Sequence, residues 1–269
     1  SDYVPLLKAG YKAAKAADPQ AVVVAAALAP TIDRGPANRN DTLFLQEMYD
    51  ADAREYFDIM STMAYGLLSG PDDRRLDAFW QVNVSRSLLL RQIMVENGDA
   101  GKPIWFSELA WNALPASFAE TPLYGRVTED QQARYTVRAL RRMQDEWPWA
   151  SVAFIWFFRR PNDSERGQQF YYFRLVEPDF TPLPVYQAIG RAAPSLKVVP
   201  RGWYSPVHWA VAAGGDWQRA GPAAFPELRA DKTGASLSFT FSGTELSIVA
   251  RGPGRLHVDV PGARLPCDG

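Results

Sequence analysis

The sequence has a single cysteine, Cys267, and only two histidines, His208 and His257. One cysteine excludes a disulfide within the chain and any metal site built from several cysteines. Two histidines leave little for a histidine-based metal centre, so zinc, thiol and Ser-His-Asp chemistries are disfavoured. We therefore expect no metal and no cofactor. Carboxylate chemistry supported by aromatic stacking remains, because the chain has 9 Trp, 11 Tyr and 14 Phe.

The chain also lacks an excess of charge of either sign. Lys and Arg together number 29 and Asp and Glu 30, a formal net charge of −1, which removes the electrostatic attraction typical of nucleic-acid-binding proteins. The longest apolar run, Ala21–Pro30, is too short to span a bilayer. Ser1–Gly10 does not have the pattern of a signal peptide. We expect neither a nucleic-acid partner nor a membrane span.

Residues 1–196 alternate helix patterns with short apolar strand patterns. Helices are predicted over 3–17, 42–54, 76–97, 128–147 and 184–193, and strands over 21–28, 59–65, 103–109 and 152–158. Thr128 and Gln131 have the spacing of a capping box. Strands that alternate with helical crossovers predict an α/β fold with a parallel sheet.

The number of strands limits the possible architectures. An eight-stranded (β/α)8 TIM barrel needs roughly 250 residues, and only four strands are predicted before residue 196. We therefore expect residues 1–196 to be the C-terminal half of such a barrel, strands five to eight, with the first half outside this chain. The alternative is a complete small doubly wound sheet.

Residues 197–269 follow a different pattern. Glycine and proline become frequent, and apolar and polar residues alternate over 236–241, 245–250 and 255–260. This period predicts antiparallel strands with one solvated face. We expect a partial antiparallel β-sandwich, an accessory module that is cut short. The connecting stretch contains the aromatic residues Trp203, Tyr204, Trp209 and Trp217. Two roles are possible for them: they form a sugar-binding platform, or they pack this module against the first domain.

Glu108 is the strongest candidate for chemistry. It lies at the C-terminal end of the strand predicted over 103–109, where a barrel builds its active site. Strict alternation places it on one face of the strand with Ile104 and Phe106. A carboxylate on an apolar face must be paired, hydrogen-bonded or functional, because unpaired burial is costly. A structural glutamate paired with a loop arginine is the alternative.

Other candidates lie at or just beyond the strand ends. Tyr65 ends the preceding strand, and its hydroxyl is suited to orient a neighbouring carboxylate. The alternative is that Tyr65 lies at the rim of the sheet and has no hydrogen-bond partner. Trp156 offers an apolar platform for a sugar ring, although core packing explains it equally well. Further residues that we expect at the same mouth are Trp111, Asn112 and Arg159.

The segment Trp105–Trp111 (WFSELAW) resembles the strand-seven signature of the retaining clan A glycoside hydrolases, most closely the family 39 xylosidase and iduronidase relatives, with family 5 next. Three further segments resemble strands five, six and eight of those barrels in the same order: DPQAVVVAAALAPT (18–31), MSTMAYG (60–66) and FIWFFR (154–159). The resemblance implies that Glu108 is the nucleophile, that Tyr65 orients it, and that Trp156 contacts the substrate.

Two positions depart from the family pattern. The strand-six histidine of the family is Met63 here, and the chain contains no Asn-Glu pair, which in the family carries the general acid/base glutamate on strand four. We therefore expect a hydrolase of oligo- or polysaccharides in the parent protein and an inactive isolated chain. A non-catalytic carbohydrate-binding or structural protein with a degenerate barrel is the alternative. The resemblance implies an extracellular or cell-surface protein; a cytoplasmic location stays open.

Overall fold

The computed structural model describes residues 2–35, 37–196, 198–199, 204–208, 211–221, 227–241 and 244–260. The first 196 residues hold the main helices and strands, in the chain order α1 (Tyr3–Ala17), α2 (Asp41–Asp50), β1 (Met60–Tyr65), α3 (Ser87–Glu96), β2 (Ile104–Ala110), α4 (Glu129–Glu146), β3 (Ala150–Ile155) and α5 (Pro184–Leu196). Short 3-10 helices lie between them: η1 (Arg54–Tyr56), η2 (Val84–Arg86), η3 (Asp163–Glu165) and η4 (Gln169–Phe173). No helix of the described ranges is long and apolar enough to cross a bilayer.

The central sheet is parallel, with the strand order β1-β2-β3. The segment predicted as the first strand, 21–28, runs parallel beside β1 and the residue before it, but it pairs through two isolated bridges, Val24–Ile59 and Leu28–Thr62, and not through a continuous ladder. Only Ala25 and Leu28 of this segment are buried, because it has a neighbour on one side only. The parallel arrangement is the predicted one, and the first strand is less regular than expected.

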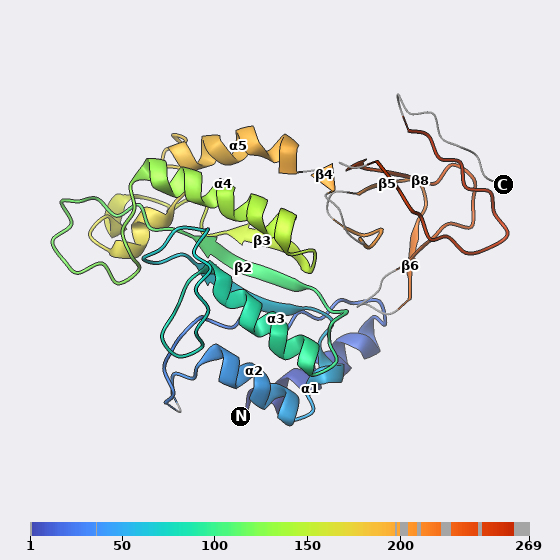
Figure 1. Cartoon of the computed structure of the whole chain (residues 1–269), viewed down its shortest axis with the longest axis horizontal. Helices are drawn as coiled ribbons and strands as arrows, with labels where there is room; N and C mark the ends of the chain where they lie inside the picture. The colour runs from blue at the N-terminus through green and yellow to red at the C-terminus, as the bar shows by residue number, and fades with distance from the viewer. Residues whose placement is uncertain are drawn as a thin grey trace.

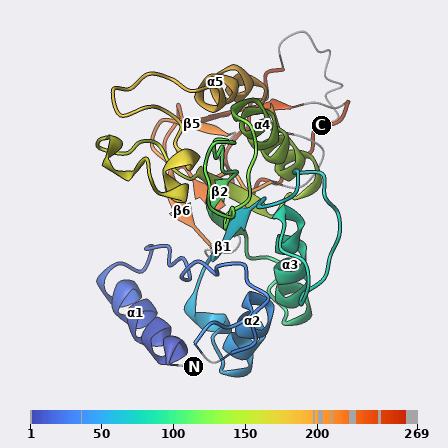
Figure 2. The same ribbon diagram turned by 90° about the vertical axis from the view of Figure 1, so that its left-hand side faces the viewer.

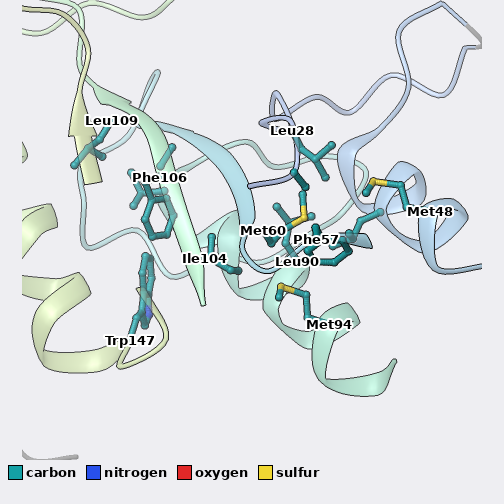
Figure 3. Close-up of a cluster of buried hydrophobic side chains, with 14 of the residues drawn as sticks. Leu28, Met48, Phe57, Met60, Leu90, Met94, Ile104, Phe106, Leu109 and Trp147 are labelled. Carbon is teal, nitrogen blue, oxygen red and sulfur yellow. The ribbon is translucent and has the colours of Figure 1, made fainter. Parts of the chain in front are cut away.

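One face of the sheet is covered by helices, which form an arc around it (Figure 2). The apolar core lies in this layer, where Met60 of β1 and Ile104 of β2 meet Leu90 and Met94 of α3 (Figure 3). Phe106 points from β2 toward Trp147, with 6.0 Å between the ring centroids. We call this side of the sheet the helix face and the other side the open face.

Two helix boundaries differ from the prediction by four residues or more. The helix predicted over 76–97 begins only at Ser87, because the Asn83 side chain caps the backbone N–H of Arg86 and starts η2 there. The helix predicted over 42–54 ends at Asp50, and Asp52 follows in the left-handed region with φ 58°. The capping box of α4 is confirmed: Thr128 accepts from the Gln131 N–H, and the Gln131 side chain accepts from the Thr128 N–H.

The C-terminal segment forms short strand pairs, drawn beyond α5 in Figure 1. The pairs are β4 (Val198–Val199) with β9 (Thr240–Phe241), β5 (Ala212–Gly214) with β8 (Ser236–Ser238), and β6 (Gln218–Ala220) with β7 (Glu227–Arg229). The last two pairs are antiparallel, and β4–β9 is parallel. The single strand predicted over 236–241 is thus divided between β8 and β9.

The strands predicted over 245–250 and 255–260 are wrong for this structure, since the described stretch 244–260 contains no strand. The alternation of apolar and polar residues indicates two faces, but a strand also needs a neighbouring strand to pair with. Val249 and Leu256 of these segments remain exposed. Trp217 ties β5 to β8 by donating its indole N–H to the carbonyls of Gly214 and Ser236. Tyr204 packs against the ring of His208, while Trp203 and Trp209 lie outside the described residues.

Candidate functional site

The face on which Glu108 lies is set by an irregularity in β2. Thr62 of β1 pairs with Phe106, but the next residue, Met63, pairs with Glu108. Ser107 is therefore an extra residue, as in a β-bulge. Phe106 faces the helix layer, whereas Glu108 shares the open face with Met63. The prediction that Ile104, Phe106 and Glu108 share one face is wrong, because strict alternation fails across the bulge.

Tyr65 and Glu108 meet on the open face. The Tyr65 hydroxyl donates a hydrogen bond to Oε2 of Glu108, and the two residues come from the ends of adjacent parallel strands. Burial, and after it the hydrogen bond to Glu108, raise the pKa of the Tyr65 phenol well above its ordinary value. Tyr65 therefore stays protonated and acts as a donor to the carboxylate, which leaves Oε1 of Glu108 without this bond.

Aromatic side chains surround this pair. Phe173 of η4, which is buried, packs edge-on against Tyr65 with 5.6 Å between ring centroids. Tyr124 packs edge-on against the ring of Phe173, with 6.0 Å between ring centroids. Farther along the open face, Phe154 of β3 contacts Trp105 of β2. The open face thus presents a carboxylate together with aromatic rings.

Trp156 lies just past the end of β3, where its backbone N–H donates to the carbonyl of Leu109. Its side chain is 37% exposed, and its ring packs edge-on against Phe157. The structure therefore leaves Trp156 accessible at the C-terminal edge of the sheet.

Two buried glutamines join the loops that follow β2 and β3. Gln132 of α4 donates to the carbonyls of Trp111 and Tyr172, at 2.9 and 3.2 Å. Gln169 of η4 accepts from the Leu123 N–H at 2.8 Å and donates to the Thr121 carbonyl at 2.9 Å. These bonds hold the loop that carries Tyr124 against η4, which carries Phe173.

Trp111 and Asn112 are not at the mouth, contrary to the prediction. Both are 1% exposed. The Trp111 indole donates to the Ser69 carbonyl at 2.8 Å and lies so close to Gly66 that a Cβ there would be 1.8 Å from its Nε1. Asn112 is enclosed with it, and its side-chain amide has no hydrogen-bond partner within the described part of the chain. The loop after β2 folds inward because Trp111 is large and apolar enough to fill the space beside Gly66.

Arg159 also differs from the prediction. Its guanidinium donates to the carbonyls of Arg160 and Pro178 and lies 4.3 Å from the ring centre of Phe180. These contacts tie it to the loop before α5, because a planar guanidinium is satisfied by carbonyls along its edge and an aromatic ring on its face. Arg159 therefore anchors a loop in this structure.

The acids of the surrounding loops are occupied by other partners. Asp72 pairs with Arg138, Asp73 with Arg75, and Asp163 with Arg166. Glu165 lies 3.0 Å from Arg160, and Asp33 accepts from the Asn38 side chain. Glu108 is the acid that the structure ties to Tyr65 on the open face. No group of His, Cys, Asp and Glu within the described residues is arranged to hold a metal ion.

Tyr124, Phe173 and the two glutamines were not among the residues predicted for the site. Tyr124 and Phe173 lie in loops without strand or helix periodicity, and a glutamine that bonds to backbone carbonyls leaves no sequence pattern. Their places near Tyr65 depend on how the loops after β2 and β3 pack on each other. The aromatic richness of 167–173 (GQQFYYF) was the only available signal.

No family model and no curated protein matches the sequence. Solved structures do match, and glycoside hydrolases are among them. A family 39 glycoside hydrolase from Bacteroides cellulosilyticus WH2 matches with a TM-score of 0.53 and 20% identity over 71% of this chain and 37% of that chain. A glucosidase from Croceicoccus marinus (TM-score 0.49, 18% identity) covers 72% of this chain and 35% of its own.

A family 2 beta-galacturonidase from Eisenbergiella tayi has the same TM-score, 0.49, and 18% identity over 75% of this chain and 32% of its own. The chain therefore spans about a third of the length of these structures. The likeness to the family 39 enzyme shows that the chain shares the fold of part of a glycoside hydrolase.

Proposed function

We propose that this chain belongs to a retaining glycoside hydrolase that cleaves O-glycosidic bonds in oligo- or polysaccharides, with Glu108 as the nucleophile. The observation that carries the proposal is the hydrogen bond between the Tyr65 hydroxyl and the Glu108 carboxylate at the ends of adjacent parallel strands. The shared fold with a family 39 glycoside hydrolase supports it. The bulge in β2, which turns Glu108 away from the apolar core, supports it as well.

The roles follow from the chemistry of glycoside hydrolysis. Oε1 of Glu108 attacks the anomeric carbon while the glycosidic C–O bond breaks, and a second carboxyl group gives its proton to the leaving oxygen. Water then gives a proton to that second group and attacks the same carbon, which breaks the ester bond and releases Glu108. The Tyr65 hydroxyl fixes the rotamer of the carboxylate during both steps. Trp156 supplies an apolar surface for the sugar ring.

The proposal includes the architecture of the parent protein. Four parallel segments, 21–28 and β1 to β3, correspond to strands five to eight of a (β/α)8 barrel, and 197–269 to a β-sandwich module. In a retaining enzyme the two carboxyl groups are about 5–5.5 Å apart. Since the loop acids have other partners, we assign the acid/base to a part of the polypeptide outside this chain.

The decisive experiment replaces Glu108 in the full polypeptide. Glu108→Gln preserves shape and should lower kcat by roughly 10³-fold or more, because no covalent intermediate can form. In Glu108→Ala, added azide should restore part of the turnover and give a glycosyl azide of inverted configuration.

Glu96→Gln is the matched control, because Glu96 is an exposed residue of α3 and its loss should leave turnover unchanged. Unaltered turnover in Glu108→Gln would refute the assignment of the nucleophile. Sugar binding by the wild-type protein without any turnover would favour the non-catalytic alternative instead.

A further inference from the structure

A groove of about 470 Å³ lies between α4 and α5, two helices that run side by side (Figure 1). It belongs to the helix layer and is thus separated by the sheet from Glu108 on the open face. Four arginines line it: Arg134, Arg138 and Arg141 of α4 and Arg191 of α5. Asp130, in the first turn of α4, is the single acid of the lining.

The partners of these arginines distinguish the groove from the rest of the α/β part. Residues 2–196 contain seventeen arginines. Fourteen of them have an ion pair, a hydrogen bond or an aromatic ring as partner. The three without such a partner among the described residues are Arg134, Arg141 and Arg191, and all three line this groove.

The arrangement of the three charges is regular. Arg134, Arg138 and Arg141 follow the i, i+4, i+7 spacing that places residues on one helix face. Arg138 is held by Asp72 at 2.9 Å, so Arg134 and Arg141 are the free charges of α4. Seven residues of helix separate them by about 10 Å along the axis. Arg191 faces them from α5. Like charges gathered in this way repel one another unless an anion lies between them.

We infer that this groove binds an acidic oligosaccharide, whose carboxylate or sulfate groups contact Arg134, Arg141 and Arg191. Guanidinium groups recognise such oxyanions through paired N–H donors. A spacing of about 10 Å requires a ligand with more than one anionic group. Between the arginines the lining is small and apolar, with Ala133, Val137 and Ala188 among its residues, and suits the C–H surface of a sugar.

A single-stranded nucleic acid is the less suitable ligand. Proteins that bind it stack its bases on aromatic side chains, and no aromatic residue is part of the groove lining that the structure describes. The choice of a carbohydrate rests on the proposed function, whereas the anion site rests on the arginines alone. Binding requires no hydrolysis, so it can be tested separately from the role of Glu108.

The test measures binding to the full polypeptide at low salt by calorimetry. The probes are a sulfated oligosaccharide, an oligouronide, a neutral oligosaccharide of the same length and a short single-stranded oligonucleotide. We expect the acidic sugars to bind, with the affinity falling as salt screens the charges. Comparison of the first two probes distinguishes sulfate from carboxylate as the recognised group.

Three variants locate the binding. The triple replacement Arg134→Gln, Arg141→Gln and Arg191→Gln should weaken binding roughly tenfold or more, the product of three contacts each worth about two- to threefold. Asp130→Asn removes the single acid and should strengthen binding about twofold. Replacing Arg75, Arg229 and Arg251 by Gln removes the same net charge from exposed positions outside the groove and should leave binding nearly unchanged.

The inference is overturned if the acidic oligosaccharides bind no better than the neutral one. Equal weakening by both triple variants would also overturn it, since binding would then depend on net charge and not on the groove. Tighter binding of the oligonucleotide would overturn the assignment of a carbohydrate ligand.

Discussion

Met63 of β1 lies in register with Glu108 of β2, although the preceding pair joins Thr62 to Phe106. One extra residue in β2, Ser107, therefore decides that Phe106 enters the apolar core while Glu108 reaches the open face. Without it, Phe106 and Glu108 would share the helix face, and the carboxylate would face the apolar core. Bulges of this kind are frequent next to active sites because they re-aim a side chain without changing the sheet around it.

Buried tyrosines should make the protein sensitive to alkaline pH. The pKa values of Tyr49 and Tyr65 are raised by burial and then by the carboxylates of Asp99 and Glu108. The folded state therefore keeps protons that the unfolded state loses above about pH 10. The contribution of these tyrosines to the free energy of unfolding is therefore complete below that pH. It falls as the pH rises, by up to about 1.4 kcal/mol per pH unit for each tyrosine.

Urea unfolding at a series of alkaline pH values checks this expectation. Tyr49→Phe removes one of these groups and should reduce the slope of the free energy of unfolding against pH. Tyr186→Phe, at an exposed position of α5, is the control and should retain the wild-type slope. Parallel curves for all three proteins would contradict the assignment of the alkaline sensitivity to buried phenols.

The sequence predicts features that are local along the chain. The capping box of α4 needs only Thr128 and Gln131 three residues apart, and it forms. The meeting of Tyr65 and Glu108 follows from the rule that parallel strands end at the same edge. That prediction is confirmed, although the prediction that Glu108 shares a face with Phe106 is wrong. The second prediction failed because the bulge at Ser107 depends on the pairing of β2 with its neighbours and not on its own residues.

Features set by packing between distant segments could not be predicted in this way. Trp111 and Asn112 follow a strand end, as a mouth residue does, yet the loop turns inward where Trp111 meets Gly66. Arg159 is satisfied by a carbonyl of Pro178 and the ring of Phe180. The start of α3 depends on a cap at Asn83 that no periodicity reveals. In each case the deciding partner lies in another loop or in a single polar side chain.

The buried pair Asp41–Arg86 should be essential for stability. The two residues are 1% and 2% exposed, and Nε of Arg86 donates to Oδ1 of Asp41 at 2.8 Å. Asp41→Asn leaves the guanidinium buried without a counter-charge, so we expect a loss of about 3–5 kcal/mol in the free energy of unfolding.

Urea denaturation followed by circular dichroism measures this loss. Glu47→Gln removes the partner of Arg39 in a pair that is considerably more exposed, and it should cost about 0–1 kcal/mol. A similar cost for the two variants would show that the burial of Asp41 and Arg86 does not control their contribution.

The Gln169 side chain should keep the loop around Tyr124 in place. Gln169→Glu retains the acceptor for the Leu123 N–H but loses the donor to the Thr121 carbonyl, and it sets two oxygens against each other. We expect hydrogen exchange of the Leu123 amide to accelerate by about tenfold or more, as local opening becomes easier by about 1.4 kcal/mol.

Exchange measured by mass spectrometry on peptides covering 116–126 tests this expectation. Gln92→Glu on α3 introduces the same change in charge at an exposed position and should leave these peptides unaffected. Unchanged protection in Gln169→Glu would mean that other contacts hold the loop.

The isolated 269-residue chain should be inactive on aryl glycosides even when it folds. This prediction depends on the proposed function, in which Glu108 is one of two catalytic carboxyl groups. A good leaving group needs little protonation in the first step, but water still needs a base to hydrolyse the glycosyl-enzyme in the second. Within the described residues the loop acids Asp72, Asp73, Asp163 and Glu165 are paired with arginines, so none is free to serve as that base.

A panel of nitrophenyl glycosides, assayed with the purified chain and with its Glu108→Gln variant, tests this last prediction. The variant prepared in parallel reveals any contaminating glycosidase, because such activity would be equal in both samples. A single burst of nitrophenol without further turnover is compatible with the proposal, since Glu108 can form the intermediate without a base to release it. Steady turnover that disappears in Glu108→Gln would show instead that an acid of this chain, or of a second copy, completes the site. The assignment of the acid/base to another part of the polypeptide would then be wrong, while Glu108 would stand as the nucleophile.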